Sequence, residues 1–169
     1  MADAKVGDGT QITNMPLTGK MYVDDSGVDK YVDFDDLTET GTFTPTLGDG
    51  TNDYTLSTAT GNYTRIGKQV TAYINITWTD LGSAGGTILR VGGLPYAATS
   101  AAGFRAGTNL AYVDGLDNGA GKQITGWLAA SVDYISFYLI NDNAAPSSLL
   151  ANSSNSTGIL QLSVSYQAA

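Results

Sequence analysis

The sequence contains no cysteine and no histidine. Disulfides, thiolate or imidazole metal ligands, cysteine nucleophiles and histidine general bases are therefore excluded. Glutamate occurs once, at Glu39, so a glycosidase with paired carboxylates would have to rely on aspartates. These absences lead us to expect a protein that is not an enzyme and that needs no cofactor.

Charged residues are also scarce, at 14% of the chain, and acidic ones outnumber basic ones by 16 to 8. The net charge of −8 repels phosphate backbones and anionic membranes, so we expect no nucleic-acid partner and no membrane insertion. No apolar run approaches the ~18 residues of a membrane span, and the first residues do not read as a signal peptide. We therefore expect synthesis in the cytoplasm, with the protein soluble there.

Apolar and polar side chains alternate in the clearest runs after residue 40. One run places apolar side chains at Val70, Ala72, Ile74, Ile76 and Trp78, with Thr71, Tyr73, Asn75, Thr77 and Thr79 between them or following. A second run has the same pattern from Leu160 to Tyr166. This period of two is typical of antiparallel strands with one buried and one solvent-facing side.

A third run, from Asp133 to Ile140, is apolar at both odd and even positions. It indicates either a strand covered on both faces or a strand at a subunit interface. Gly, Asn and Asp clusters separate eight or nine strand-like segments, and no segment of helical length has a convincing 3.6-residue period. The pattern predicts an all-β fold, an antiparallel jelly-roll-like β-sandwich, with a seven-stranded immunoglobulin-like sandwich as the alternative.

Residues 1–40 differ from the rest, because they hold nine acidic residues and only three lysines. Lys20–Val23 and Lys30–Phe34 are predicted to pair as a hairpin across residues 24–27. An isolated hairpin is marginal, so we expect this segment to become ordered on a partner. The sequence thus predicts an N-terminal attachment arm, residues 1–40, and a β-sandwich knob domain, residues 41–169.

Three short motifs suggest chemistry, and we interpret each as structural. Asp114 and Asp117 lie in a Gly/Asn-rich turn, where aspartate is favoured for local hydrogen bonding. Residues 119–122, Gly-Ala-Gly-Lys, lack the other positions of a phosphate-binding loop. Asp33, Asp35 and Asp36 could offer oxygen atoms to calcium, but their spacing does not match a calcium loop, so we predict a solvated or partner-facing patch and no metal site.

Three stretches, in chain order, resemble segments of one group of proteins. The first is Ile12-Thr13-Asn14-Met15-Pro16-Leu17, followed by Tyr22-Val23, Gly27-Val28, Tyr31-Val32 and Asp36-Leu37. The second comprises residues 41–47 and 61–70, and the third is Gly92-Gly93-Leu94-Pro95-Tyr96. They resemble virion surface proteins of tailed bacteriophages: capsid decoration (cement) proteins and head-fibre or tail-fibre tips with a C-terminal β-sandwich. The resemblance implies a homotrimer whose N-terminal part attaches to the virion while its C-terminal jelly roll projects.

Two roles fit this resemblance. A trimeric decoration protein would dock its arm on the major capsid protein, whereas a receptor-binding tail-fibre tip would attach to a tail adaptor and bind a host-surface glycan. We favour decoration, because the chain has no heptad run or repeat that could build a fibre shaft. A carbohydrate-binding module and a polysaccharide-cleaving enzyme are the alternatives from other classes. The docking contacts are expected at apolar side chains of the arm: Met15, Leu17, Met21, Tyr22, Tyr31 and Phe34.

Overall fold

A computed structural model describes residues 20–25, 28–33, 38–119, 122–141 and 144–169 of the chain. They divide into two units, a short N-terminal one that ends at Thr38 and a larger one, Glu39–Ala169, and each is described by itself. In these ranges no helix has the length and apolar character needed to cross a membrane.

The N-terminal unit contains an antiparallel hairpin. Strand β1 (Lys20–Asp25) pairs with β2 (Val28–Asp33), with Tyr22 opposite Tyr31. The hairpin predicted between Lys20–Val23 and Lys30–Phe34 is therefore confirmed. Both strands extend two residues further toward the turn than predicted, because Asp24 and Asp25 pair with Asp29 and Val28.

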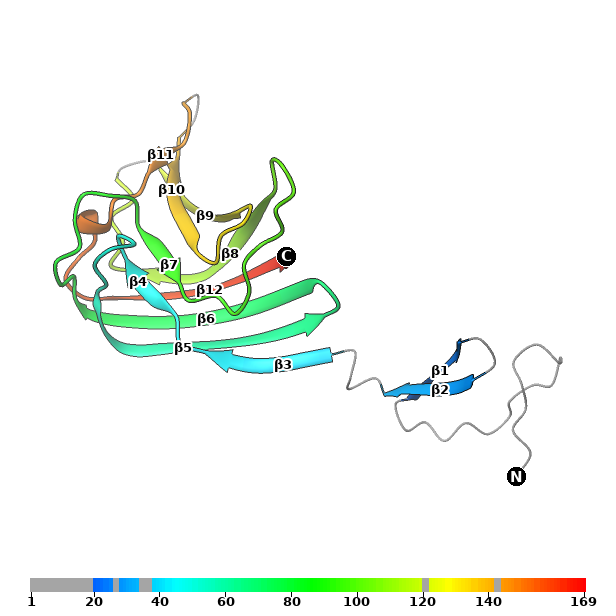
Figure 1. Cartoon of the computed structure of the whole chain (residues 1–169). Helices are drawn as coiled ribbons and strands as arrows, with labels where there is room; N and C mark the ends of the chain where they lie inside the picture. The colour runs from blue at the N-terminus through cyan, green and yellow to red at the C-terminus, as the bar shows by residue number, and fades with distance from the viewer. Residues whose placement is uncertain (1–19, 26–27, 34–37, 120–121, 142–143) are drawn as a thin grey trace. The chain divides into compact units, whose positions relative to one another are not determined.

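The larger unit is built almost entirely from antiparallel strands (Figure 1). The strands are β3 (Thr38–Phe43), β4 (Thr46–Gly48), β5 (Thr55–Ile66), β6 (Gln69–Asp80), β7 (Arg90–Gly92), β8 (Arg105–Asp114), β9 (Gln123–Ala129), β10 (Ile135–Ile140), β11 (Ser147–Ser148) and β12 (Gly158–Gln167). One short 3-10 turn, η1 (Ala151–Ser153), precedes β12. The predicted all-β, antiparallel class is confirmed.

The strands form one curled sheet with two layers rather than two separate sheets. Its order is β3-β5-β6-β12-β8-β9-β10-β7-β4, with β11 on β10. Strand β8 joins the layers, because its first residues, Arg105–Gly107, pair with β9 while the segment from Thr108 onward pairs with β12. The sheet path ends on β4, which directly follows β3 in the chain, so the sheet curls back toward its own beginning (Figure 1).

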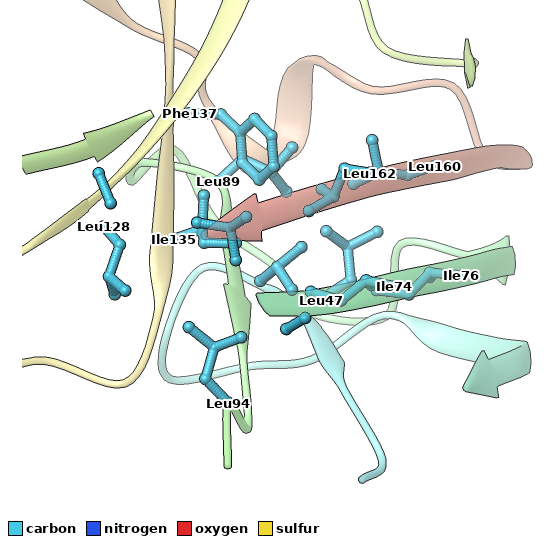
Figure 2. Packing of buried hydrophobic residues seen from close by; sticks show 14 of the residues in the cluster. Leu47, Ile74, Ile76, Leu89, Leu94, Leu128, Ile135, Phe137, Leu160 and Leu162 are labelled. Atoms are coloured by element: carbon cyan, nitrogen blue, oxygen red, sulfur yellow. The ribbon is translucent and has the colours of Figure 1, made fainter. Parts of the chain in front are cut away.

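The two predicted alternating runs form the core side of one layer. Every second residue is buried from Val70 to Trp78 of β6 and along β12, among them Ile74, Ile76, Leu160 and Leu162. Leu47 and Phe137 of the other layer lie in the same cluster (Figure 2). A fully buried aliphatic or aromatic side chain of this kind contributes roughly 1.5–3 kcal/mol through removal from water. The buried side chains of the alternating strands thus hold the two layers together.

The Asp133–Ile140 run is covered on one face only. Ile135 and Phe137 are fully buried, whereas Ile140 is 41% exposed and Tyr138 is half-buried on the outward side. Tyr138 stacks there on Trp127, with ring centroids 3.6 Å apart. The prediction of a strand covered on both faces is therefore wrong for the described residues of this chain, because the outward side chains Tyr138 and Ile140 stay partly exposed. The subunit-interface interpretation stays a prediction.

The turn after β8 lies tightly against the largest core side chain. Gly115 has a φ of +81°, and a Cβ on Gly158 would lie 2.2 Å from Trp78 Cζ2. The Trp78 indole is 1% exposed and its Nε1 donates a hydrogen bond to the Asn155 carbonyl at 2.9 Å. Glycine at these two positions lets the chain pass directly over the indole.

Candidate functional site: the outward face of the curled sheet

The outward face of β5, β6, β12 and β8 carries uncharged polar side chains in cross-strand rows. One row runs Thr60, Asn75, Gln161, Tyr112 across the four strands, and the next runs Asn62, Tyr73, Ser163, Asn109. These are the solvent-facing positions of the same alternation that buries Ile74 and Leu162. Period-two strands therefore build this face and the core at once.

A shallow depression of about 360 Å³ follows these rows. We call it the amide groove, and its outward-pointing lining is Thr60, Asn62, Tyr73, Asn75, Asn109, Ala111, Gln161 and Ser163. Gln161 Nε2 donates a hydrogen bond to Asn75 Oδ1 at 3.2 Å, so neighbouring amides orient one another. The Tyr73 side chain is 58% exposed beside them.

The chemistry of the groove favours a neutral, polyhydroxylated ligand. Each side-chain amide presents two N–H donors and a carbonyl acceptor, and each hydroxyl can donate and accept. No carboxylate or cation lines the groove, so it offers neither an acid–base pair nor an ion-pairing group. An exposed tyrosine ring adds an apolar surface with a polar edge, the combination favoured at binding surfaces.

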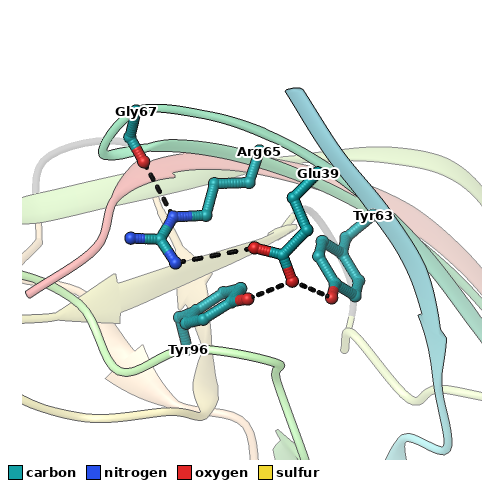
Figure 3. Close-up of polar contacts among 5 residues, drawn as sticks. All are labelled: Glu39, Tyr63, Arg65, Gly67 and Tyr96. Carbon is teal, nitrogen blue, oxygen red and sulfur yellow. Dashed lines mark hydrogen bonds and ion pairs between the residues drawn. The ribbon is translucent and has the colours of Figure 1, made fainter. Parts of the chain in front are cut away.

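A second polar cluster lies at the start of β3 and is drawn in Figure 3. Glu39 Oε1 accepts hydrogen bonds from the Tyr63 hydroxyl at 2.7 Å and the Tyr96 hydroxyl at 2.5 Å. Arg65 Nη1 lies 3.7 Å from Glu39 Oε2, and its Nε donates to the Gly67 carbonyl at 2.7 Å. The Arg65 guanidinium also sits 4.4 Å from the centre of the Tyr96 ring. We call these residues the Glu39 cluster.

The protonation states of the Glu39 cluster suit a structural role. The hydrogen bonds from Tyr96 and Tyr63, together with the Arg65 charge, lower the pKa of Glu39 below its ordinary value of 4.5. The hydrogen bond to Glu39 in turn raises the pKa of Tyr63 well above 10. A general acid needs a raised carboxyl pKa and a nucleophilic tyrosine a lowered one, so the two shifts fit neither of these catalytic roles. The cluster ties β3 to β5 and to the loop after β7.

Asp49 has a comparable structural role in the loop after β4. Its Oδ1 accepts hydrogen bonds from the backbone N–H groups of Thr51 and Asn52, and its Oδ2 accepts one from Gly85 N–H, each at 2.7 Å. These bonds, the one from Asn52 most of all, hold the pKa of Asp49 far below its usual range. The carboxylate thus fastens two loops that are 36 residues apart in the sequence.

Of the predicted docking residues, three lie outside the described residues: Met15, Leu17 and Phe34. Met21, Tyr22 and Tyr31 lie on the hairpin strands, but their side-chain environments are also outside what the structure describes. The docking role therefore stays a prediction. Asp35 and Asp36 of the acidic patch, and the centre of the Gly-Ala-Gly-Lys motif, lie outside the described residues as well.

The turn interpretation is confirmed for Asp117, whose Oδ1 accepts the Gly119 N–H at 2.8 Å. Asp114 ends β8 and is followed by Gly115 in the left-handed conformation, which is ordinary turn geometry. Among the described residues, no three acidic side chains come together in a way that could hold a metal ion.

The comparisons with known proteins bear on the fold. No protein-family model matches the sequence, and no curated protein matches it. The chain is similar in structure to the Dettilon tailspike protein (gp208), with a TM-score of 0.62 over 76% of this chain and 20% sequence identity. The matched region is 24% of the tailspike chain, so this chain spans about a quarter of that protein's length. At this identity the likeness establishes a shared fold.

Proposed function

We propose that this chain is the host-surface-binding tip of a bacteriophage tail fibre or tailspike, and that the amide groove binds a surface polysaccharide. The observation that carries the proposal is the groove itself, an uncharged row of amides and hydroxyls around an exposed tyrosine. Sugars present many hydroxyl groups, each of which needs donors and acceptors in a bound state. The groove supplies both from four adjacent strands.

Two independent likenesses support a phage origin. The sequence resembles virion surface proteins, and the fold is similar to part of a tailspike. The structural likeness is to a tail protein, whereas nothing in the described residues supports capsid decoration specifically. We therefore prefer the tail-tip role over the decoration role that the sequence analysis favoured.

In this account the protein binds without cleaving its ligand. Glycoside hydrolysis needs two carboxyl groups flanking the scissile bond, and the lining of the amide groove includes none. The N-terminal hairpin serves as the attachment segment toward a tail adaptor. The chain acts as a homotrimer on the virion, which would present three grooves and raise avidity for a repetitive polymer.

A panel of purified bacterial surface polysaccharides, immobilised and probed with the full-length protein, tests the proposal. The variant carries Asn75→Ala and Gln161→Ala, which together remove two amides from the centre of the groove. Each lost hydrogen bond costs about 0.5–1.5 kcal/mol, so affinity for the bound polysaccharide should fall by roughly tenfold or more.

Ile66→Ala is the matched control. Ile66 is 61% exposed at the end of β5 and does not line the groove, so its truncation should leave binding unchanged. Equal binding by the groove variant and the wild type would contradict the assignment of the site. Failure of the wild type to bind any polysaccharide would contradict the function.

A further inference from the structure

Three planar side chains stand in a row on the outward face of the other layer. The Trp127 ring stacks on Tyr138 with an interplanar angle of 10°, and the Arg105 guanidinium lies 5.1 Å from the centre of the Trp127 ring. Because β9 lies between β8 and β10, Arg105 and Tyr138 flank Trp127 from opposite sides. We call this row the aromatic ladder.

The outward residues around the aromatic ladder are small and polar. Gly107 and Ser136 are the cross-strand partners of Trp127, and Thr125 is the partner of Tyr138. A Cβ at Gly107 would meet no atom within 4 Å, so the space beside the indole is open. The ladder is therefore accessible from solvent along one edge, with hydroxyl groups beside it.

Arg105 brings a positive charge to this face of an acidic protein. Residues 39–169 contain eight acidic and five basic residues, a net charge of −3. Arg65 is within ion-pair distance of the Glu39 carboxylate, whereas Arg105 is exposed. Contact with an aromatic ring restricts the guanidinium, and its planar fork matches a carboxylate in a bidentate arrangement.

The ladder is continuous with the amide groove along β8. From the ladder to the groove, the exposed positions of this strand are Arg105, Gly107, Asn109 and Ala111, and the last two line the groove. Six residues of extended chain cover about 20 Å. No bulky outward side chain interrupts this path between the two sites.

We propose that the aromatic ladder is a second subsite, which binds a carboxylate-bearing sugar residue of the same polysaccharide whose neutral part occupies the amide groove. This inference rests on the proposed function. Arg105 binds the carboxylate, Trp127, itself stacked on Tyr138, holds the guanidinium in place, and the open strip at Gly107 carries the connecting sugars. A protein partner is the competing occupant, because Trp, Tyr and Arg are also enriched at protein interfaces. The ladder's immediate neighbours, Gly107, Thr125 and Ser136, are small or polar and favour the sugar.

The test uses bacterial capsular polysaccharides that contain uronic acid, each compared with its carboxyl-reduced form. Arg105→Gln should weaken binding of the acidic polymer roughly tenfold or more, which is typical for loss of a charge-assisted hydrogen bond, and should leave the carboxyl-reduced polymer unaffected. Arg105→Lys keeps the charge without the planar fork, so its affinity for the acidic polymer should lie between those of the wild type and Arg105→Gln. Lys68→Gln removes an equal charge from the exposed β5–β6 turn and should have no effect.

Gly107→Glu and Gly107→Gln form a second pair that does not depend on removal of a packed side chain. Both fill the open strip, and the glutamate should weaken acidic polymers more because it repels their carboxylates. Equal affinity of wild type and Arg105→Gln for every acidic polymer, with the groove variant still impaired, would overturn the ladder alone. If the groove variant and Arg105→Gln both bind polysaccharide like the wild type, and Arg105→Gln changes the oligomeric mass, the ladder is a protein contact. That result would also overturn the proposal.

Discussion

At the scale of single residues, two glycines of the sheet differ sharply in what surrounds them. A methyl group on Gly158 would overlap the Trp78 ring and come within 2.4 Å of the Asp114 carbonyl oxygen, whereas one on Gly107 would enter open space. Gly158→Ala should therefore lower the free energy of unfolding by about 3 kcal/mol. Gly107→Ala should leave it unchanged or raise it by roughly 0.5 kcal/mol, because alanine costs less backbone entropy. Urea denaturation of both variants checks this, and equal stabilities would contradict the packing around Trp78.

The Glu39 cluster makes a prediction about pH. Because the pKa of folded Glu39 lies below its ordinary value of 4.5, the ionised carboxylate stabilises the fold above that pH, and the contribution is lost as the pH falls through the folded pKa. Glu39→Gln should thus melt below the wild type at neutral pH, and the gap should close as the pH falls below 4.5 and through the folded pKa. Thermal melts across this range measure the gap. A gap that stays constant, or widens in acid, would show that the carboxylate charge is not what stabilises the cluster.

At the scale of elements, the sequence predicts the strands well, but it predicts poorly which strands pair and what covers each face. The burial of Ile74 and Leu162 follows from a period of two, which depends only on adjacent residues. The outward position of Tyr138 does not follow from the sequence, because a run that is apolar at both odd and even positions fits a strand with either face buried. The same period predicts that Tyr73 and Asn75 on β6 face solvent, but it does not predict that they line a groove.

The candidate sites depend on pairings that local patterns cannot specify. Gln161 and Asn75 are 86 residues apart, and they meet only because β12 lies between β6 and β8. The aromatic ladder likewise requires the order β8, β9, β10. A signal was present in the sequence, namely amide and hydroxyl residues at the solvent-facing positions of long strands, but its meaning needs the strand order.

The hairpin β1–β2 makes a prediction that separates attachment from stability. In the full chain, Tyr31→Ala combined with Phe34→Ala should release the protein from virions. The thermal melting of the Glu39–Ala169 unit should stay nearly unchanged, because that unit has its own buried core. Sedimentation of variant virions and melting of the purified protein measure the two effects. Unfolding or loss of oligomer in the variant would instead give these side chains a role in folding.

At the scale of the whole molecule, the proposed polysaccharide-binding role rests on surface chemistry. An all-β head with a neutral groove and an adjacent arginine–aromatic row is suited to polysaccharide, and its fold is shared with part of a tailspike. Attachment through the short N-terminal unit stays a prediction from the sequence. Trimeric assembly stays a prediction from the sequence resemblance, and it would multiply the weak contacts that shallow grooves provide.

The number of copies per virion, relative to the major capsid protein, tests the tail-tip role most directly. Quantitative mass spectrometry of purified virions gives this ratio. A tail tip should be present in a small number set by the symmetry of the tail, far below the capsid protein. A copy number comparable to that of the capsid protein would contradict the tail-tip role and restore decoration of the shell, and complete absence from virions would contradict a virion role of either kind.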